Sequence, residues 1–507
     1  MAERWKADIK TDTRMGIELI AESETNCRTL GRSQELVPVR PGIQRPHDDS
    51  KSKAALLTAR KPKTSTKYVL VVAVLVLLGL MAPGAKAQDW FRTGTGLGVS
   101  KPKVAVADFV SRNDASPMMA ALFSDVVRND LDYSGILELA SKSFYPTQVP
   151  SVPMELNYQA WSDPPTSAQF LAFGNLTVTG TSEEIQAWFN DVKNPSAPPV
   201  VGRVYRGDAN EEQTRRYAHQ FADEIIARLS GGLPGVASTQ IAFVSGRSGN
   251  KEIWAMDYDG ANQHELTSLH SIALTPRWSP DGDRIAFTCY PTAGSILSAQ
   301  ICVYSTVSSR LLSWPRYRGT NSSPAWSPDG SKIMFMSSML GNPELFISEA
   351  DGSRPKRLTH STGADTSAAW NPKTGQQVAF VSDRGGTPQL YIMDADGSEV
   401  QKVELTDKGY VIDPAWSPNG QLLAFAWRRP NGNYDLYVMD IASHALVELT
   451  RDAGRNERPS WAPDGRHIAF ESTRTGTRQI WSMLADGTEV RQLTMQGQNE
   501  SPNWSPK

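Results

Sequence analysis

The chain has 507 residues, and its 52 basic and 54 acidic side chains leave a formal net charge of −2. This balance creates no field that would attract a polyanion, so it argues against nucleic-acid binding. Three cysteines are too few for a disulfide-rich scaffold, and 38 glycines, 33 prolines and 14 tryptophans favour an all-β repeat architecture over a helical one.

The first recognisable element is a secretion signal at residues 67–87, which follows a polar leader over 1–66. Lysines precede an apolar run over 68–81, and an Ala-Lys-Ala segment follows a Pro-Gly pair. A membrane-spanning helix needs roughly 20 apolar residues, and this run is shorter. We therefore expect cleavage between Ala87 and Gln88, with release of the mature chain and no stable membrane insertion; a membrane anchor is the alternative. The leader would then lie outside the mature protein.

A small α/β domain is predicted over residues 101–232, after a flexible Gly- and Thr-rich segment at 88–100. One helix is expected to begin with Ser116 as its N-cap and Pro117 at its first position. A second amphipathic helix is expected over 210–230, because a Gly-Gly pair follows it. Strands are expected at 103–110, 136–139, 170–179, 187–190 and 200–206.

From residue 236 to the end, the sequence repeats with a period near 45. Each unit has a strand ending in Trp, a Pro-Asp-Gly turn, a strand of the Ile-Ala-Phe type, a third strand, an Asp-Gly turn and a fourth strand ending in Leu-Thr. Several short strands per unit of this length are typical of a β-propeller. The anchoring tryptophans are Trp278, Trp326, Trp370, Trp416, Trp461 and Trp504.

The two ends of the repeat region complement each other. The last unit contains only the first strand of a blade, and the first unit lacks that strand. We therefore expect residues 502–506 to complete the blade formed by 240–267, which leaves no exposed blade edge. The predicted fold is mainly β: a six-bladed β-propeller over 236–507, preceded by the small α/β domain.

The repeat, together with the preceding domain and the signal peptide, resembles the TolB family. The motifs that carry this resemblance are the Trp-Ser-Pro-Asp-Gly units, the Ile-Ala-Phe strands and the Asp-Gly turns followed by Leu-Thr, within residues 67–507. The resemblance implies a monomeric, non-catalytic periplasmic protein of the Tol-Pal system that binds the peptidoglycan-associated lipoprotein Pal. It also implies roles in outer-membrane integrity and in envelope constriction during cell division.

The resemblance further implies contact between the mature N-terminus and TolA. In the family this segment is rich in β-branched residues, whereas here residues 88–101 are rich in Gly and Thr. Trp90 and Phe91 are the candidate anchors for TolA in this chain.

The sequence carries no motif for catalysis or metal binding. It has no Gly-x-Ser-x-Gly or His-Glu-x-x-His segment, and its histidines are scattered. We therefore expect no enzyme, cofactor or metal; a secreted propeller-containing peptidase or a glycan-binding protein is the alternative. The segments 257–260 and 394–397 both read Asp-x-Asp-Gly like the start of a calcium loop, but the rest of that loop is missing, so we expect turns.

Two cysteines fall on neighbouring strands of one predicted blade. The repeat alignment places Phe287 opposite Cys302, which makes Cys289 a diagonal neighbour of Cys302 on the same face. A disulfide and two free thiols are both compatible with this spacing.

A partner surface is predicted at one mouth of the propeller channel. The first strand of each blade lines the channel, so the residues just before it should form a ring at one mouth, where loop-end side chains contribute little to packing. Polar groups around apolar positions are typical of a protein interface, although such residues can also simply end loops. The predicted positions are Asn321, Ser322, Asp365, Thr366, Val411, Ile412, Asn456, Glu457, Asn499 and Glu500.

Overall fold

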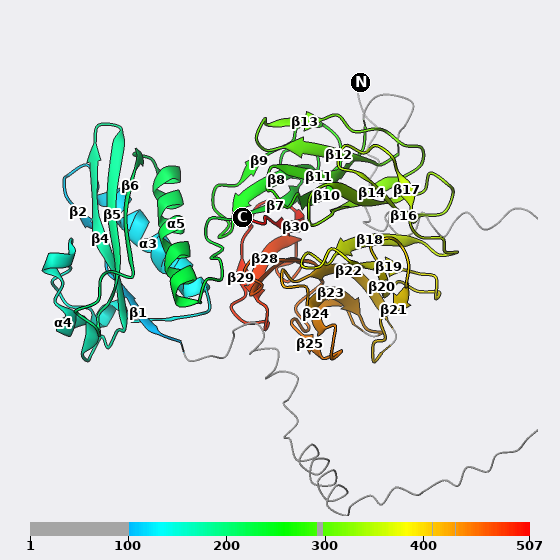
Figure 1. The fold of residues 1–507 in the computed structure, drawn as a ribbon. Coiled ribbons are helices and arrows are strands. Elements are labelled where there is room, and N and C mark those ends of the chain that lie inside the picture. Colours follow the sequence, from blue (N-terminus) through cyan, green and yellow to red (C-terminus); the bar gives the residue numbers. More distant parts are fainter. Residues whose placement is uncertain (1–100, 292–297, 408, 431) are drawn as a thin grey trace, which may run out of the picture. The chain divides into compact units, whose positions relative to one another are not determined.

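The computed structural model describes residues 101–291, 298–407, 409–430 and 432–507, all within one compact unit. In these ranges the chain forms a mixed sheet with two long helices, followed by six four-stranded sheets. Figure 1 shows the α/β part and the propeller that follows it in the chain. The fold is therefore mainly β, with a six-bladed propeller and a small α/β part, as the sequence predicted. No helix in these ranges is long and apolar enough to cross a membrane.

Several predicted features lie outside the described residues. They are the leader, the signal peptide with its cleavage site at Ala87 and Gln88, and the segment 88–100 that contains Trp90 and Phe91. Processing at this site and contact with TolA therefore stay predictions.

The α/β part contains a six-stranded sheet in the order β3-β1-β4-β5-β6, with β2 also pairing with β4. β1 pairs in parallel with β3 and β4, whereas β4, β5 and β6 form antiparallel hairpins. β5 begins five residues before the predicted strand, because its polar first half completes the ladder with β4. The strands are β1 (Lys103–Val106), β2 (Val110–Ser111), β3 (Glu138–Leu139), β4 (Phe170–Thr179), β5 (Ser182–Asp191) and β6 (Val201–Asp208).

Two long helices, α3 (Pro117–Tyr133) and α5 (Glu211–Leu229), pack against each other and against this sheet. Asn210 caps α5 by accepting a hydrogen bond from the Gln213 backbone N–H at 2.9 Å. Ser116 precedes α3 as predicted, but its hydroxyl donates to Asn113 Oδ1 and makes no bond to the helix. The short helices are η2 (Lys142–Phe144), η3 (Pro153–Glu155) and α4 (Tyr158–Ser162).

Each blade has four antiparallel strands, and we number the blades from the one that contains β7. The innermost strands are β30 (Asn499–Trp504), β10 (Ala273–Trp278), β14 (Asn321–Trp326), β18 (Asp365–Trp370), β22 (Tyr410–Trp416) and β26 (Asn456–Trp461). The second strands are β7 (Gln240–Ser245), β11 (Arg284–Cys289), β15 (Lys332–Ser337), β19 (Gln377–Ser382), β23 (Leu422–Arg428) and β27 (His467–Ser472).

The outermost strand of each blade is shorter and more exposed than the other three strands. The third strands are β8 (Glu252–Asp257), β12 (Gln300–Ser305), β16 (Glu344–Glu349), β20 (Gln389–Asp394), β24 (Tyr434–Asp440) and β28 (Gln479–Leu484). The outermost strands are β9 (His264–Glu265), β13 (Arg310–Leu312), β17 (Lys356–Arg357), β21 (Gln401–Lys402), β25 (Leu446–Glu448) and β29 (Arg491–Gln492). The second strands carry the core, because their alternating apolar side chains pack against both neighbouring blades.

The ring closes through the last strand of the chain. β30 pairs antiparallel with β7, with Asn499 opposite Ser245 and Trp504 opposite Ile241. Trp504 is 4% exposed, and its indole N–H donates to Thr239 Oγ1 at 2.7 Å. Blade 1 is thus assembled from two segments that lie far apart in the sequence.

All six innermost strands share a β-bulge that the sequence did not reveal. Three residues before each tryptophan, a residue other than glycine takes a left-handed backbone conformation, with φ between 51° and 56°. In blades 3 and 1 the N–H at the bulge donates to the second strand of the preceding blade: Ser323 to Thr288 at 3.0 Å, and Ser501 to Glu471 at 2.8 Å. The strain of this conformation is therefore offset there by bonds that join neighbouring blades.

Blade 2 contains a disulfide between Cys289 and Cys302, with Cα atoms 5.9 Å apart. Cys302 lies opposite Phe287 in the ladder, so the two cysteines are diagonal neighbours. The structure therefore contains the disulfide and not two free thiols, both of which were compatible with the sequence.

Candidate functional site at the channel mouth

The predicted partner positions form two groups that the structure places in different environments. The ten predicted residues are five pairs of consecutive positions, one pair in each of blades 1 and 3–6. The first residue of each pair is at most 1% exposed. The expectation that these side chains stand free at a rim and contribute little to packing is therefore wrong for them. They belong to strands rather than to loop ends, and they are Asn321, Asp365, Val411, Asn456 and Asn499.

A repeated hydrogen-bond network accounts for the burial of three of these residues. In blade 4, Arg384 donates from Nε to Ser382 Oγ at 2.9 Å and from a terminal nitrogen to Asp365 at 2.8 Å. The same arrangement recurs at Ser472, Arg474 and Asn456 in blade 6, and at Ser245, Arg247 and Asn499 in blade 1. This network joins the first two strands of a blade. In the sequence this network corresponds to a Ser-x-Arg segment that starts at the last residue of the second strand, a pattern that the repeat alignment did not reveal.

The two charged residues of this network in blade 4, Asp365 and Arg384, differ in burial. Asp365 has a fully buried side chain, whereas Arg384 is 24% exposed and also lies over the Tyr391 ring at 5.0 Å. Burial raises the pKa of Asp365, although the hydrogen bonds from Ser382 and Arg384 oppose this shift. Asp365 is thus part of the structural core and is unsuited to direct contact with a partner.

The second residues of these pairs differ in charge and exposure between the two sides of the mouth. Ser322, Thr366 and Ile412, in blades 3–5, are partly exposed and uncharged; we call them the neutral half. In blades 6 and 1 the corresponding residues are Glu457 and Glu500, which are 4% and 7% exposed. The mouth is therefore asymmetric.

The two glutamates are paired with more exposed cations. Glu500 is 2.6 Å from Lys251 and 3.2 Å from Arg478, and Glu457 is 2.7 Å from Arg455. We call these five residues the ionic half. Burial opposes ionisation of Glu500, but Arg458 and Lys251 outweigh it and hold its pKa below the usual range.

A buried carboxylate lies behind the ionic half. Glu471 on β27 is 3% exposed, and it lies 3.7 Å from both Arg458 and Arg478. Burial raises its pKa even though these arginines oppose the shift. The cluster links blade 6 to blade 1, so it fixes the geometry of the ionic half without requiring a ligand.

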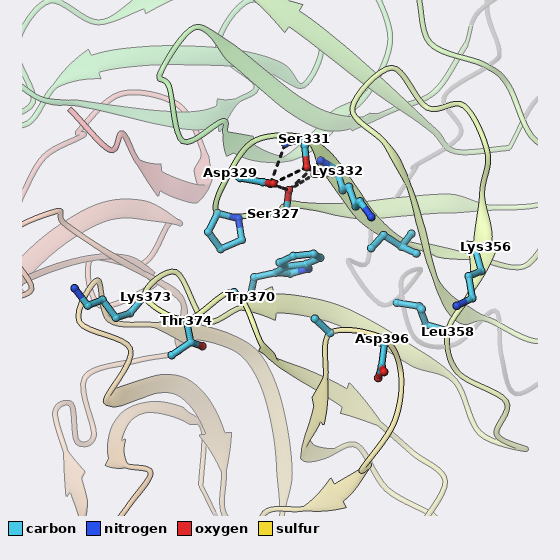
Figure 2. Close-up of a pocket in the computed structure, with 14 residues that line it drawn as sticks. Ser327, Asp329, Ser331, Lys332, Lys356, Leu358, Trp370, Lys373, Thr374 and Asp396 are labelled. Atoms are coloured by element: carbon cyan, nitrogen blue, oxygen red, sulfur yellow. Dashed lines mark hydrogen bonds between the residues drawn. The ribbon is translucent and has the colours of Figure 1, made fainter.

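A hollow of about 610 Å³ lies at the opposite ends of the strands, between blades 3 and 4 (Figure 2). Its walls are the turns at Ser327–Ser331 and Lys373–Gly375, and Trp370 lies between them. Hydrogen bonds from Ser327 and Ser331 lower the pKa of Asp329 to about 2. Its carboxylate therefore stays ionised at neutral pH and serves the turn.

The α/β part contacts blades 1 and 6 of the propeller toward this same end of the strands, which we call the turn face. The Tyr258 hydroxyl donates to Asp130 at 2.6 Å, and Arg491 lies 3.0 Å from Asp132. Tyr133 at the end of α3 donates its hydroxyl to Ser482 at 2.5 Å. The channel mouth lies at the other ends of the strands, away from these contacts.

Comparison with known proteins matches both parts of the chain. The model of the TolB amino-terminal domain matches residues 95–194, and the model of the TolB beta propeller domain matches 228–412 and 405–507. A Protein TolB homolog of Chlorobium chlorochromatii is 33% identical over 51% of the chain and 56% of its own length. The Tol-Pal system protein TolB of Bordetella pertussis is 30% identical over 59% of the chain and 65% of its own length.

The matches therefore span between half and two thirds of the curated relatives. A crystal structure of TolB from Acinetobacter baumannii shares the fold, with a TM-score of 0.68, 24% identity and coverage of 81% of the chain and 98% of that structure. The matched domains cover most of the described residues in the order that the sequence predicted. This chain belongs to the TolB family.

Proposed function

We propose that this chain is the TolB component of a Tol-Pal system and acts as a non-catalytic, monomeric adaptor in the periplasm. The observation that carries the proposal is the presence of both TolB domains, in order, in one chain. Curated relatives are named Tol-Pal system protein TolB. Its partner would be the lipoprotein Pal, and the complex would support outer-membrane integrity and constriction during division. Contact with TolA through Trp90 and Phe91 belongs to the same proposal.

The channel mouth is the surface that best suits a protein partner. Its neutral half offers hydroxyl groups beside Ile412, and its ionic half offers cations at the edge. A surface that combines apolar, hydroxyl and charged groups has the mixed composition of a protein interface. The α/β contacts lie at the turn face, which leaves the mouth for a partner.

The partner is tested by affinity capture from the native envelope with the purified chain as bait. We expect a peptidoglycan-binding lipoprotein as the main captured protein. Turnover of a peptide or glycan substrate by the purified chain would support the enzyme alternative instead. Capture without any lipoprotein would contradict the proposal.

The surface is tested by substitutions that avoid the buried first positions. Thr366→Arg together with Ile412→Arg should raise the Kd for the soluble domain of the lipoprotein at least about tenfold, because each adds bulk and charge to the neutral half. Arg455→Glu should change the salt dependence of association, since rim charges act largely on the encounter rate. Lys373→Glu, on the exposed turn face, is the matched control and should leave the Kd unchanged. Unchanged binding by the folded mouth variants would assign the partner to another surface.

A further inference from the structure

A separate group of polar side chains lies where α5 meets the turn between β8 and β9. His219 on α5 is 3% exposed, and its Nδ1 is 2.7 Å from the Asp130 carboxylate. Its other ring nitrogen, Nε2, is buried and has no hydrogen-bond partner. A ring nitrogen of His219 and one carboxylate oxygen each from Asp257 and Asp259 lie within 4.8 Å of one another. Because Nδ1 is engaged, Nε2 is the nitrogen free to bind a ligand.

The residues behind His219 fix the orientation of its ring. Asp130 is 2% exposed, and its second oxygen accepts the Tyr258 hydroxyl at 2.6 Å. A carboxylate that accepts a hydrogen bond from Nδ1 holds the proton there, so Nε2 keeps a free lone pair for a ligand. This carboxylate–histidine pair is the arrangement that commonly supports a metal ligand in proteins.

The charges at the group leave a deficit of positive charge. Asp130, Asp257 and Asp259 carry three negative charges, and Arg215, which is paired with Asp259, carries one positive charge. With a neutral imidazole the sum is −2, which matches a divalent cation. The Asn262 side chain donates to one oxygen of Asp257 at 2.5 Å. Nε2 of His219, by contrast, has no hydrogen-bond partner.

We propose that His219, Asp257 and Asp259 bind a divalent transition-metal cation, with Zn²⁺ as the best-suited ion. One imidazole nitrogen with two carboxylate oxygens is a donor set for Zn²⁺, whereas Ca²⁺ requires six to eight oxygens. The bound ion would join α5 of the α/β part to blade 1 of the propeller.

The repeat provides an internal control for this site. Segment 394–397 in blade 4 has the same Asp-x-Asp-Gly turn as 257–260. Within the described ranges, His219, Asp257 and Asp259 are the one group of three such side chains brought within 4.8 Å. A metal that binds wherever this turn occurs would bind both turns, whereas a site that needs the histidine would bind only at blade 1.

The test is calorimetric titration of Zn²⁺ into the purified, untagged full-length protein after removal of metal by a chelator. We expect one saturable site, and a visible absorption change when Co²⁺ replaces Zn²⁺. His219→Gln and Asp257→Asn should each weaken affinity about 100-fold or more, because loss of an outer partner alone typically costs about 10- to 100-fold. Asp259→Asn, at an exposed residue, keeps the test valid if the buried variants fail to fold. Asp394→Asn should leave affinity unchanged. The absence of saturable binding, or equal affinity in the Asp259→Asn variant, would overturn the proposal.

Discussion

Replacement of Trp504 by alanine tests how firmly the last strand closes the ring. Trp504 is 4% exposed and donates to Thr239, and its backbone N–H donates to Ser460 Oγ at 2.9 Å. Trp370 occupies the equivalent place in β18, but it is partly exposed and its indole nitrogen has no hydrogen-bond partner. Trp504→Ala and Trp370→Ala therefore remove the same kind of side chain. The first removes it from the strand that closes the ring, and the second from a blade whose four strands are consecutive in the chain.

The expected cost follows from burial and from the lost hydrogen bond. Truncation of a buried aromatic side chain to alanine costs about 3–5 kcal/mol. Loss of the bond to Thr239 adds about 1 kcal/mol. The sum for Trp504, about 4–6 kcal/mol, is a large part of the roughly 5–15 kcal/mol that stabilises a typical domain. Trp370→Ala should cost about half as much, because less apolar surface returns to water.

The measurement is urea unfolding followed by circular dichroism, with hydrogen exchange of the β7 amides. Trp504→Ala should unfold at a lower urea concentration than Trp370→Ala, and β7 should lose protection first. Removal of residues 501–507 should have a larger effect and cause aggregation, because it exposes the edge of β7. The reasoning would be refuted if the truncated chain unfolded like the parent, or if the two alanine variants were equally stable.

Three further outcomes are expected. Arg384→Ala should lower the free energy of unfolding by about 3–5 kcal/mol, because it leaves the buried Asp365 carboxylate unpaired. Arg474→Ala should lower it by only about 1–3 kcal/mol in the same denaturation assay, because the partner of Arg474 is the neutral amide of Asn456. Burial opposes ionisation of Asp464, but the interactions with His467 and Arg466 outweigh it and hold the pKa of Asp464 well below the usual value. Its contribution should therefore be complete above about pH 4 and lost as the pH falls toward the folded-state pKa, and Asp464→Asn should flatten this acid limb of the stability profile. Paired serine replacement of the blade 2 disulfide, whose cysteines are 13 positions apart, should lower stability by about 3 kcal/mol in chemical denaturation.

The repeat made the propeller predictable, because each blade uses the same turn and packing residues. The spacing of tryptophans predicted the blade period, and the incomplete first and last units led to the closing pair of β30 and β7. In the Pro-Asp-Gly turns, glycine is required by the backbone: Gly330 has φ of 68°. Such local requirements appear directly in the sequence.

Contacts between distant segments could not be predicted in the same way. The segment around Asp464 reads like the other Pro-Asp-Gly turns, yet Asp464 is buried beside His467, whose other ring nitrogen meets the Tyr133 carbonyl. The burial of Asp365 likewise depends on Arg384, which lies in the loop after the neighbouring strand β19. A repeat alignment aligns positions within blades, but it does not reveal which blades the α/β part covers.

The order in which the chain is made has a consequence for the closing strand. The bond between Trp504 and Thr239 joins residues 265 positions apart, so β7 is made long before β30. A chain exported with its amino-terminal end first presents β7 before β30 in the same order, and a hairpin forms within about 1–10 μs. Five blades can therefore assemble while blade 1 still lacks its inner strand. The folding protein spends that time with an unpaired edge, which is the stage at which a chaperone that covers exposed strands would protect it most.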